Sequence, residues 1–276
     1  MIEKNYGIIG RSLSHSLSPF LHNYWFTKYR VKAKYSLIEI EPNEIGSIIL
    51  RIKKKELQGI NVTVPYKQAV IPYLDSIINE AKSTQSVNTI SLNEEGKVIG
   101  DNTDVYGLEQ SFVNKLVTQN LKQKKILVLG AGGVTFSVVY ALKNKGANQI
   151  IVSNRTLEKA ENVKRMFPFI ELLDWKNIED GLEKIDIIIN ATSLGLKGGE
   201  DFKQEFKNTK TNLIYYDVIY NPIETKLIKK FKKKGIQTFN GLEMFIYQAQ
   251  KSFFLWNKIM PELDEKLKES MVLKLK

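Results

Sequence analysis

The fold of this chain is indicated most clearly by one stretch, KKILVLGAGGV, at residues 124–134. An apolar run leads into Gly130, Gly132 and Gly133, and a helical pattern follows. Glycine lets the backbone turn sharply and approach a phosphate, while a helix N-terminus offers N–H groups and a positive dipole end. The stretch therefore predicts a strand, turn and helix that bind a dinucleotide. A plain structural turn is the alternative, because Thr135 stands where the third glycine of G-x-G-x-x-G would be.

The next expected strand, 149–153, ends in a group that distinguishes two nucleotides. An NAD site usually has Asp or Glu there, bonded to the ribose 2′-hydroxyl. This chain has Asn154, Arg155 and Thr156 instead, with Lys159 within reach in the following helix, 157–167. A guanidinium pairs well with a 2′-phosphate. The sequence predicts NADP over NAD; in the alternative interpretation, Thr156 caps a helix and Arg155 is merely exposed.

Alternating strands and helices continue through the second half of the chain. Apolar strands are expected at 125–129, 184–190 and 212–218, with a helix up to about 145. Continuous apolar runs separated by helices indicate a parallel sheet covered on both faces. With right-handed crossovers this is a doubly wound, Rossmann-like α/β domain.

The first half is also expected to be α/β. Strands are predicted at 6–10, 34–40 and 60–64, a hairpin at 88–92 and 97–100, and helices at 19–29, 43–55, 71–82 and 104–118. Ser18 is expected to cap the 19–29 helix, which would begin at Pro19. We expect a substrate-binding domain at residues 1–104, completed by C-terminal helices at about 242–276, and a nucleotide domain at 105–241.

Composition excludes several kinds of chemistry. The chain has 276 residues, no cysteine and two histidines, His15 and His22. Disulfides, thiolate catalysis, iron–sulfur clusters and Cys-ligated zinc are excluded, and no metal is expected. No segment resembles a secretory signal or a membrane span, so a cytoplasmic protein is expected.

The net charge of +11 comes mostly from lysines scattered along the chain. Nucleic-acid readers usually carry arginine and exposed aromatic side chains in a basic patch. We therefore expect a solvated lysine-rich surface, with no nucleic-acid or membrane partner, and keep a nucleic-acid-binding module as an alternative. The sequence leaves open whether the protein is a homodimer.

Polar residues of the first half cluster near expected strand ends. They lie in the segments SHSLSP (14–19), GINVTVPYK (59–67) and GDNTD (100–104). Together they offer hydroxyls, amides, a lysine and a carboxylate, which are expected to serve one ligand site where the domains meet.

Eight ordered segments identify a family resemblance. GINVTVPYK, SVNTI, GDNTD, GAGGV, SNRT, NATSLG, YDVIYNP and NGLEMFIYQA resemble shikimate dehydrogenase from about residue 5 to 256. That family reduces 3-dehydroshikimate to shikimate with NADPH in aromatic amino-acid biosynthesis. It has an N-terminal substrate domain and a C-terminal dinucleotide domain.

The resemblance implies a role for each matching position. Lys67 would be the acid/base residue and Asp104 its partner. Substrate would be bound by Ser16, Ser18, Thr63, Lys67, Asn88, Asp104, Tyr220 and Gln248. NADP would be bound by Gly130, Ala131, Gly132, Gly133, Val134, Asn154, Arg155, Thr156, Lys159, Val218 and Gly241. Departures from the family pattern at Gln85, Ser86, Val105, Val218, Asn240 and Glu243 concern pocket shape and nicotinamide packing.

The residues themselves are compatible with this chemistry. Ketone reduction needs a hydride at carbon and a proton at the developing alkoxide, and a lysine ammonium can supply the proton. Lys67 could instead stabilise the alkoxide while water relays the proton. Two further readings stay open: a quinate/shikimate dehydrogenase that also uses NAD, and a non-catalytic shikimate sensor of the same fold.

Overall fold

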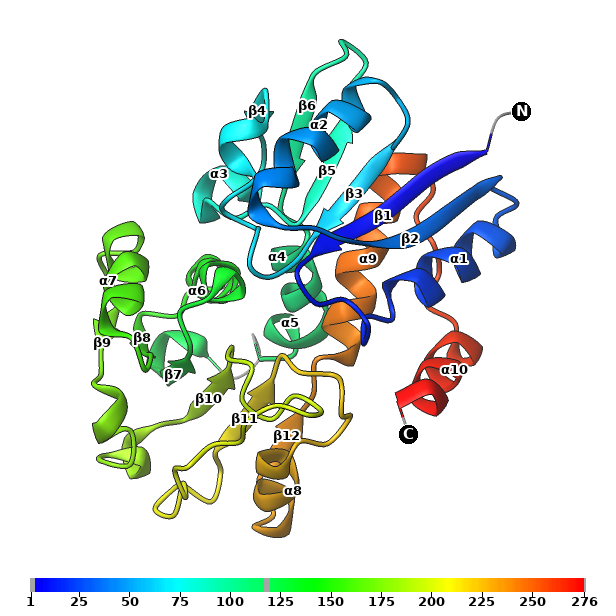
Figure 1. Ribbon diagram of the computed structural model, residues 1–276. Helices are drawn as coiled ribbons and strands as arrows, with labels where there is room; N and C mark the ends of the chain where they lie inside the picture. The colour runs from blue at the N-terminus through cyan, green and yellow to red at the C-terminus, as the bar shows by residue number, and fades with distance from the viewer. Residues whose placement is uncertain (1–2, 117–119, 276) are drawn as a thin grey trace. The chain divides into compact units, whose positions relative to one another are not determined.

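The computed structural model describes residues 3–116 and 120–275 of the chain. It divides into two compact units, each built around its own six-stranded sheet. The N-terminal unit comprises residues 1–107 and 246–271, and the C-terminal unit comprises 108–245 and 272–276. Figure 1 shows the two sheets, with the N-terminal sheet in blue to cyan and the C-terminal sheet in green to yellow.

The N-terminal unit contains a mixed sheet. Its strands are β1 (Lys4–Gly10), β2 (Ala33–Glu39), β3 (Gly59–Val62), β4 (Ser76–Ile77), β5 (Thr89–Leu92) and β6 (Val98–Asp101). They lie in the order β2-β1-β3-β5-β6-β4, and only β5 runs antiparallel to both of its neighbours, β3 and β6. β5 and β6 form the expected hairpin.

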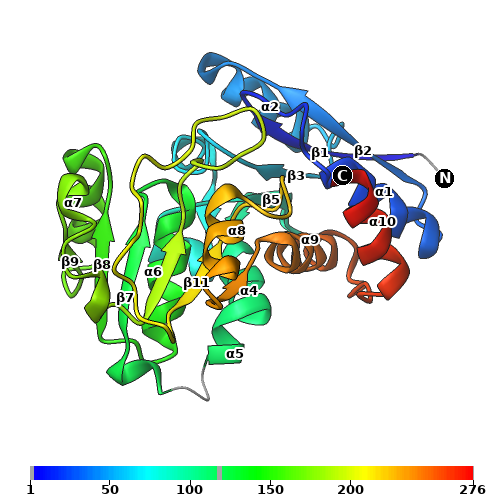
Figure 2. The same cartoon turned by 90° about the horizontal axis from the view of Figure 1, so that it is seen from below.

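Helices cover both faces of this sheet. They are α1 (Ser18–Lys28), α2 (Ile45–Lys53), α3 (Glu80–Thr84), the start of α4 (Asp104–Leu108), most of α9 (Leu242–Asn257) and most of α10 (Glu265–Leu275). The views in Figures 1 and 2 place α2 on one face, and α1 and α9 on the other. Ile45, Ile48, Ile49 and Ile52 turn one side of α2 into the core, as expected for an amphipathic helix.

Two expectations for this unit were wrong. Residues 71–82 do not form one helix: a short 3₁₀ turn leads to β4 and α3. The apolar side chains of Ile71, Leu74 and Ile77 pack on the core as a helix would place them, but Asp75 and Ile78 donate their N–H groups to β6. Sheet pairing therefore replaces the helical hydrogen bonds.

The second wrong expectation concerns the start of α1. The helix begins at Ser18, one residue early, and Leu17 occupies the cap position without a side-chain bond. The Ser18 hydroxyl accepts a hydrogen bond from the hydroxyl of Ser16, 3.2 Å away, and does not cap the helix. Pro19 does lie in the first turn, where its missing N–H costs nothing.

The C-terminal unit is a parallel, doubly wound sheet. Its strands are β7 (Lys125–Leu129), β8 (Gln149–Ser153), β9 (Glu171–Leu172), β10 (Ile187–Asn190), β11 (Ile214–Asp217) and β12 (Gln237–Phe239). Their order, β12-β11-β10-β7-β8-β9, reverses direction at β7, as in a Rossmann-like fold. The predicted fold class is confirmed.

Helices complete this unit. They are α5 (Asn114–Leu116), α6 (Gly133–Asn144), α7 (Leu157–Met166) and α8 (Lys226–Lys233). The helix expected at 104–118 is interrupted by a π-helical turn at Glu109–Val113, and its last two residues lie outside the described ones. The apolar side of α8 packs in the core against Tyr215 of β11 through Leu227, Ile228 and Phe231. Most lysines of α8 therefore lie on its exposed side.

Candidate active site

The N-terminal unit contains a lysine–carboxylate pair that is almost entirely shielded from solvent. Lys67 Nζ donates to Asp104 Oδ2 at 2.5 Å. The side chains are 11% and 7% exposed, in contrast to the other ion pairs of the described residues, which have at least one partner more exposed than either. Burying two charges is costly unless they are paired and hydrogen-bonded. Such a cost is expected at a functional site.

Lys67 is held by its immediate neighbours in the turn after β3. Tyr66 is buried, and its hydroxyl donates to the carbonyl of Ile40 at 2.6 Å. The carbonyl of Lys67 itself accepts the N–H of Val87 at 2.8 Å. The backbone on both sides of the lysine is therefore fixed, so its long side chain is aimed by a rigid base.

Asp104 is held from both its backbone and its carboxylate. Its N–H donates to Asn102 Oδ1 at 3.0 Å, and its Oδ1 accepts Asn88 Nδ2 at 2.9 Å. The amide of Asn88 can take only one orientation, because its Oδ1 accepts the N–H of Thr103 at 2.7 Å. Lys67 and Asn88 thus both donate to Asp104, one to each carboxylate oxygen, in a short chain of three hydrogen-bonded side chains.

A buried polar network beneath this chain was not foreseen from sequence. Ser252 of α9 is fully buried and contacts three hydrogen-bonding side chains: Thr89 at 2.7 Å, Asn61 at 2.9 Å and Thr103 at 3.1 Å. Its hydroxyl lies 3.0 Å from the carbonyl of Gln248 one turn earlier. The network ties α9 to the strands that hold Asp104. No local pattern predicts this, because the partners lie far apart in sequence.

The other predicted substrate residues of this unit fall into three places. Gln248 Oε1 lies 3.4 Å from Asn88 Nδ2, so Gln248 belongs with the lysine–carboxylate pair. Ser16 and Ser18 bond to each other at the start of α1. Thr63 follows β3 directly, and its N–H donates to Ile9 of β1 at 3.0 Å.

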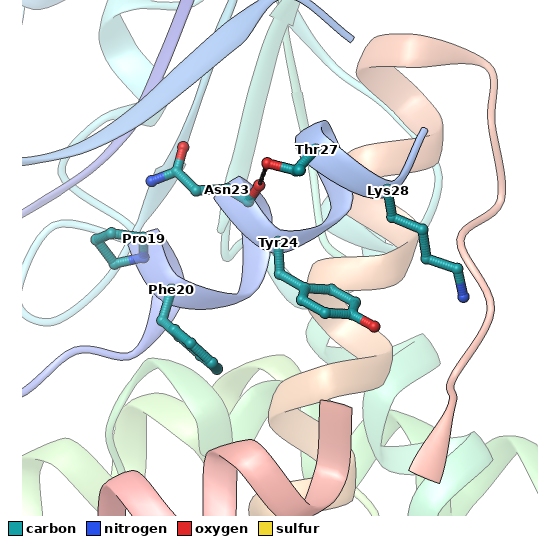
Figure 3. Close-up of a pocket in the computed structure, with 6 residues that line it drawn as sticks. All are labelled: Pro19, Phe20, Asn23, Tyr24, Thr27 and Lys28. Carbon is teal, nitrogen blue, oxygen red and sulfur yellow. Dashed lines mark hydrogen bonds between the residues drawn. The ribbon is translucent and has the colours of Figure 1, made fainter. Parts of the chain in front are cut away.

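A hollow of about 520 Å³ along α1 is a separate feature (Figure 3). It is lined by Pro19, Phe20, Asn23, Tyr24, Thr27 and Lys28, none of which is a predicted site residue. Its polar groups already have partners: Lys28 and Tyr24 bond to Asp264, and Asn23 bonds to the backbone of Tyr35. It adds nothing to the candidate active site.

The glycine turn of the C-terminal unit fits a dinucleotide. Gly130 follows β7 with a φ of 111°, and a Cβ there would lie 2.8 Å from the backbone of Ala191, so only glycine suits this position. Gly132 is exposed, and a Cβ would meet no atom within 4 Å. Ala131 precedes Gly132. The helix α6 starts at Gly133 without a side-chain cap, and Val134 lies in its first turn. The turn therefore leaves open space in front of a helix N-terminus, where a pyrophosphate would be held.

The predicted 2′-phosphate residues gather just beyond β8. Asn154 Nδ2 donates to the carbonyl of Thr156 at 2.8 Å, and Thr156 occupies the N-cap of α7 without a side-chain cap bond. Arg155 and Lys159 are exposed. The preceding Ser153 is buried, and among described residues its hydroxyl has no hydrogen-bond partner. Two cations beside these polar groups suit a phosphate. The three residues directly after β8 include no Asp or Glu, which an NAD site usually has there.

Val218 and Gly241, the two residues expected to border the nicotinamide, are in direct contact with each other. A Cβ on Gly241 would overlap the carbonyl oxygen of Val218, so a side chain there would displace the backbone after β11. Tyr220 stacks on Phe245, with ring centroids 4.4 Å apart. Tyr220 belongs to the C-terminal unit, whereas the other predicted substrate residues belong to the N-terminal unit.

Asp217, at the end of β11, is a buried carboxyl that sequence reasoning did not single out. It accepts bonds from Asn190 Nδ2 at 3.0 Å, the Tyr215 hydroxyl at 2.8 Å and the Thr225 hydroxyl at 2.9 Å. Burial raises its pKa to about 6, against the opposing effect of these bonds. Its hydrogen bonds connect the end of β10 with the segment after β11. Ala191, which follows β10, lies next to Gly130, and Val218 directly follows Asp217.

The described residues contain neither a candidate metal-ligand cluster nor a helix that could span a membrane. In residues 3–116 and 120–275, no cluster of three or more His, Asp or Glu side chains could hold a metal ion. In the same ranges, no helix is long and apolar enough to cross a membrane.

A Rossmann-like unit with a glycine-rich turn before a helix, together with a unit that holds a shielded lysine–carboxylate pair, is typical of a dinucleotide-dependent oxidoreductase. Residues 8–90 match the shikimate dehydrogenase substrate-binding domain, and residues 112–236 match the shikimate/quinate 5-dehydrogenase family. The chain belongs to the shikimate dehydrogenase family.

Individual relatives agree over nearly the whole chain. The shikimate dehydrogenase (NADP+) of Pelagibacter ubique is 46% identical over 95% of this chain and 97% of its own length. The crystal structure of the Aquifex aeolicus shikimate dehydrogenase is 37% identical, with a TM-score of 0.87 over 99% of each chain. A further shikimate dehydrogenase structure, in complex with NADP+, is 32% identical with a TM-score of 0.87, covering 99% of this chain and 96% of that one.

Proposed function

We propose that this chain catalyses the reversible, NADPH-dependent reduction of 3-dehydroshikimate to shikimate, with Lys67 as acid/base residue and Asp104 as its partner. The observation that carries the proposal is the shielded carboxylate of Asp104, which accepts hydrogen bonds from both Lys67 and Asn88. Relatives that bear the name shikimate dehydrogenase (NADP+) support the reaction and the cofactor. The reaction needs only small-molecule partners and fits the expected cytoplasmic location.

Lys67 provides the proton in the reduction. NADPH, when bound, supplies a hydride to the substrate carbonyl carbon. The carbonyl oxygen gains the electron pair of the broken π bond and takes a proton from the Lys67 ammonium, which becomes a neutral amine. An ammonium has three N–H donors, so one can hold Asp104 while another meets this oxygen. A positioned acid of this kind contributes about 10²–10⁴ in rate.

Asp104 directs the lysine. One carboxylate oxygen accepts the hydrogen bond from Lys67 and fixes the position of its ammonium, while Asn88 occupies the other carboxylate oxygen. In the reverse direction the same lysine, as the neutral amine, must accept the hydroxyl proton of shikimate. Removal of the carboxylate should therefore impair proton transfer even where the lysine stays in place.

The remaining predicted residues are proposed to bind and orient. Ser16 and Ser18 would take the substrate carboxylate, and Thr63, Asn88, Tyr220 and Gln248 would take ring hydroxyls and carboxylate. The turn at 130–134 would hold the pyrophosphate, whereas Asn154, Arg155, Thr156 and Lys159 would hold the 2′-phosphate. Val218 and Gly241 would border the nicotinamide.

The test is a spectrophotometric assay with purified protein. Shikimate and quinate are each combined with NADP+ and NAD+, and formation of reduced nicotinamide is followed at 340 nm. We expect the highest kcat/KM with shikimate and NADP+. A preference for quinate or for NAD+ would replace the proposal with a quinate/shikimate dehydrogenase, and shikimate binding without any turnover would replace it with a sensor.

A further inference from the structure

The exposed acidic side chain of Glu200 contacts Arg155, which is proposed to recognise the 2′-phosphate. Glu200 Oε2 accepts a hydrogen bond from Arg155 Nη1 at 2.9 Å. Both side chains are largely exposed, at 73% and 60%. Glu200 comes from the segment between β10 and β11, which is remote in sequence from the end of β8.

The backbone of that segment presents Glu200 to Arg155. The carbonyl of Glu200 accepts the N–H of Gly195 at 2.8 Å, and the N–H of Lys197 donates to Asn221 at 3.1 Å. The neighbouring Asp201 is engaged elsewhere, with Lys226 at 2.6 Å. Of the two adjacent acidic residues, only Glu200 therefore pairs with Arg155.

A guanidinium recognises phosphate through the same N–H groups that it offers to a carboxylate. A 2′-phosphate bound to Arg155 would have to displace Glu200 or lie beside it, and two anions at that spacing repel each other. A nucleotide with a 2′-hydroxyl brings no such charge and leaves the ion pair in place. The penalty therefore falls on the phosphorylated nucleotide alone.

We propose that Glu200 is a specificity-determining residue that competes with the 2′-phosphate for Arg155 and so limits the preference for NADP over NAD. The inference rests on the proposed NADP site. Exposed ion pairs are weak, so the competition should reduce phosphate affinity by about twofold to fivefold. The preference for NADP over NAD that Arg155 and Lys159 provide should be larger than this reduction in phosphate affinity.

The experiment measures binding of two nucleotide fragments, 2′,5′-ADP and 5′-AMP, to the full chain by calorimetry at low salt. Glu200→Gln should tighten 2′,5′-ADP about twofold to fivefold and leave 5′-AMP unchanged. Asp201→Asn is the matched control, because it changes the same charge in the same segment without touching Arg155, and it should alter neither affinity. In an Arg155→Ala background the effect of Glu200→Gln should disappear.

The outcomes separate the two claims. If wild-type protein prefers 2′,5′-ADP but Glu200→Gln leaves that affinity unchanged or weakens it, the competition is refuted while the NADP site stands. Equal tightening by Glu200→Gln and Asp201→Asn would also refute it, since only general charge would matter. If wild-type protein binds both fragments equally well, the proposed NADP site and this inference both fail.

Discussion

His22 is the clearest source of acid sensitivity in the N-terminal unit. It is fully buried, and among described residues neither ring nitrogen has a hydrogen-bond partner. Its ring stacks on Tyr35 at 4.3 Å and meets Trp25 edge-on at 5.7 Å. Burial lowers the pKa of His22 from 6.5 to about 3, because no neighbouring group compensates a charge.

The size of the effect follows from that shift. Unfolded chains bind a proton at His22 near pH 6.5, whereas the folded protein resists it, so stability is full above that pH and falls as the pH drops toward 3. Between about pH 7 and pH 4.5 this single group should remove about 2.5 kcal/mol from the free energy of unfolding. His22→Phe, which keeps an aromatic ring of similar size, should lack this loss.

Urea unfolding of the two proteins across this pH range measures the difference. Trp25 and Trp256 belong to the N-terminal unit and Trp175 to the other, so a Trp175→Phe background makes tryptophan fluorescence report the N-terminal unit alone. Substitution of the exposed His15 by Ala is the control and should leave the pH dependence unchanged. Parallel stability curves for wild type and His22→Phe between pH 7 and pH 4.5 would refute the reasoning.

Three further outcomes follow from the C-terminal unit. Gly132→Ala should raise the Kd for NADP+ at least tenfold without a change in Tm, because the added methyl meets only open space; a large drop in Tm would contradict this. Arg155→Ala should raise KM for NADP+ and barely change that for NAD+, and equal losses would make Arg155 structural. Wild type should lose stability as pH rises from about 4 to 6 and the Asp217 carboxyl ionises, and Asp217→Asn, which cannot ionise, should lack this loss; an equally steep fall in the variant's stability over that range would refute this.

Sequence reasoning placed the elements of the C-terminal unit well, because their patterns are local. The apolar run before Gly130 is a buried strand, and the strands at 149–153 and around 187–190 and 214–217 follow the same rule. The edge strands β9 and β12 were missed, since two or three partly buried residues carry no periodicity. The helix expected at 71–82 was wrong, because the apolar spacing of this segment suits both a helix and the turn and short strand that form.

The candidate site also has one part that local sequence segments indicated and another part that they did not. Lys67 and Asp104 could be singled out from their sequence segments, and the structure places them in contact. Three other features could not be predicted: the orientation of Asn88, the polar network at Ser252 and the hydrogen bonds that Asp217 accepts. Each depends on side chains brought together from distant segments. Glu200 had no local signal either, because its importance comes only from its contact with Arg155.

The central claim is that Lys67 moves the proton, and single-turnover kinetics of Lys67→Ala with shikimate and NADP+ test it most directly. The hydride-transfer rate should fall about 10²–10⁴-fold while the Kd values for both ligands stay within a few-fold of wild type. Lys82→Ala, at an exposed position of α3, serves as the matched control and should be fully active. A Lys67→Ala protein that retains a rate within fivefold of the wild type would contradict the account.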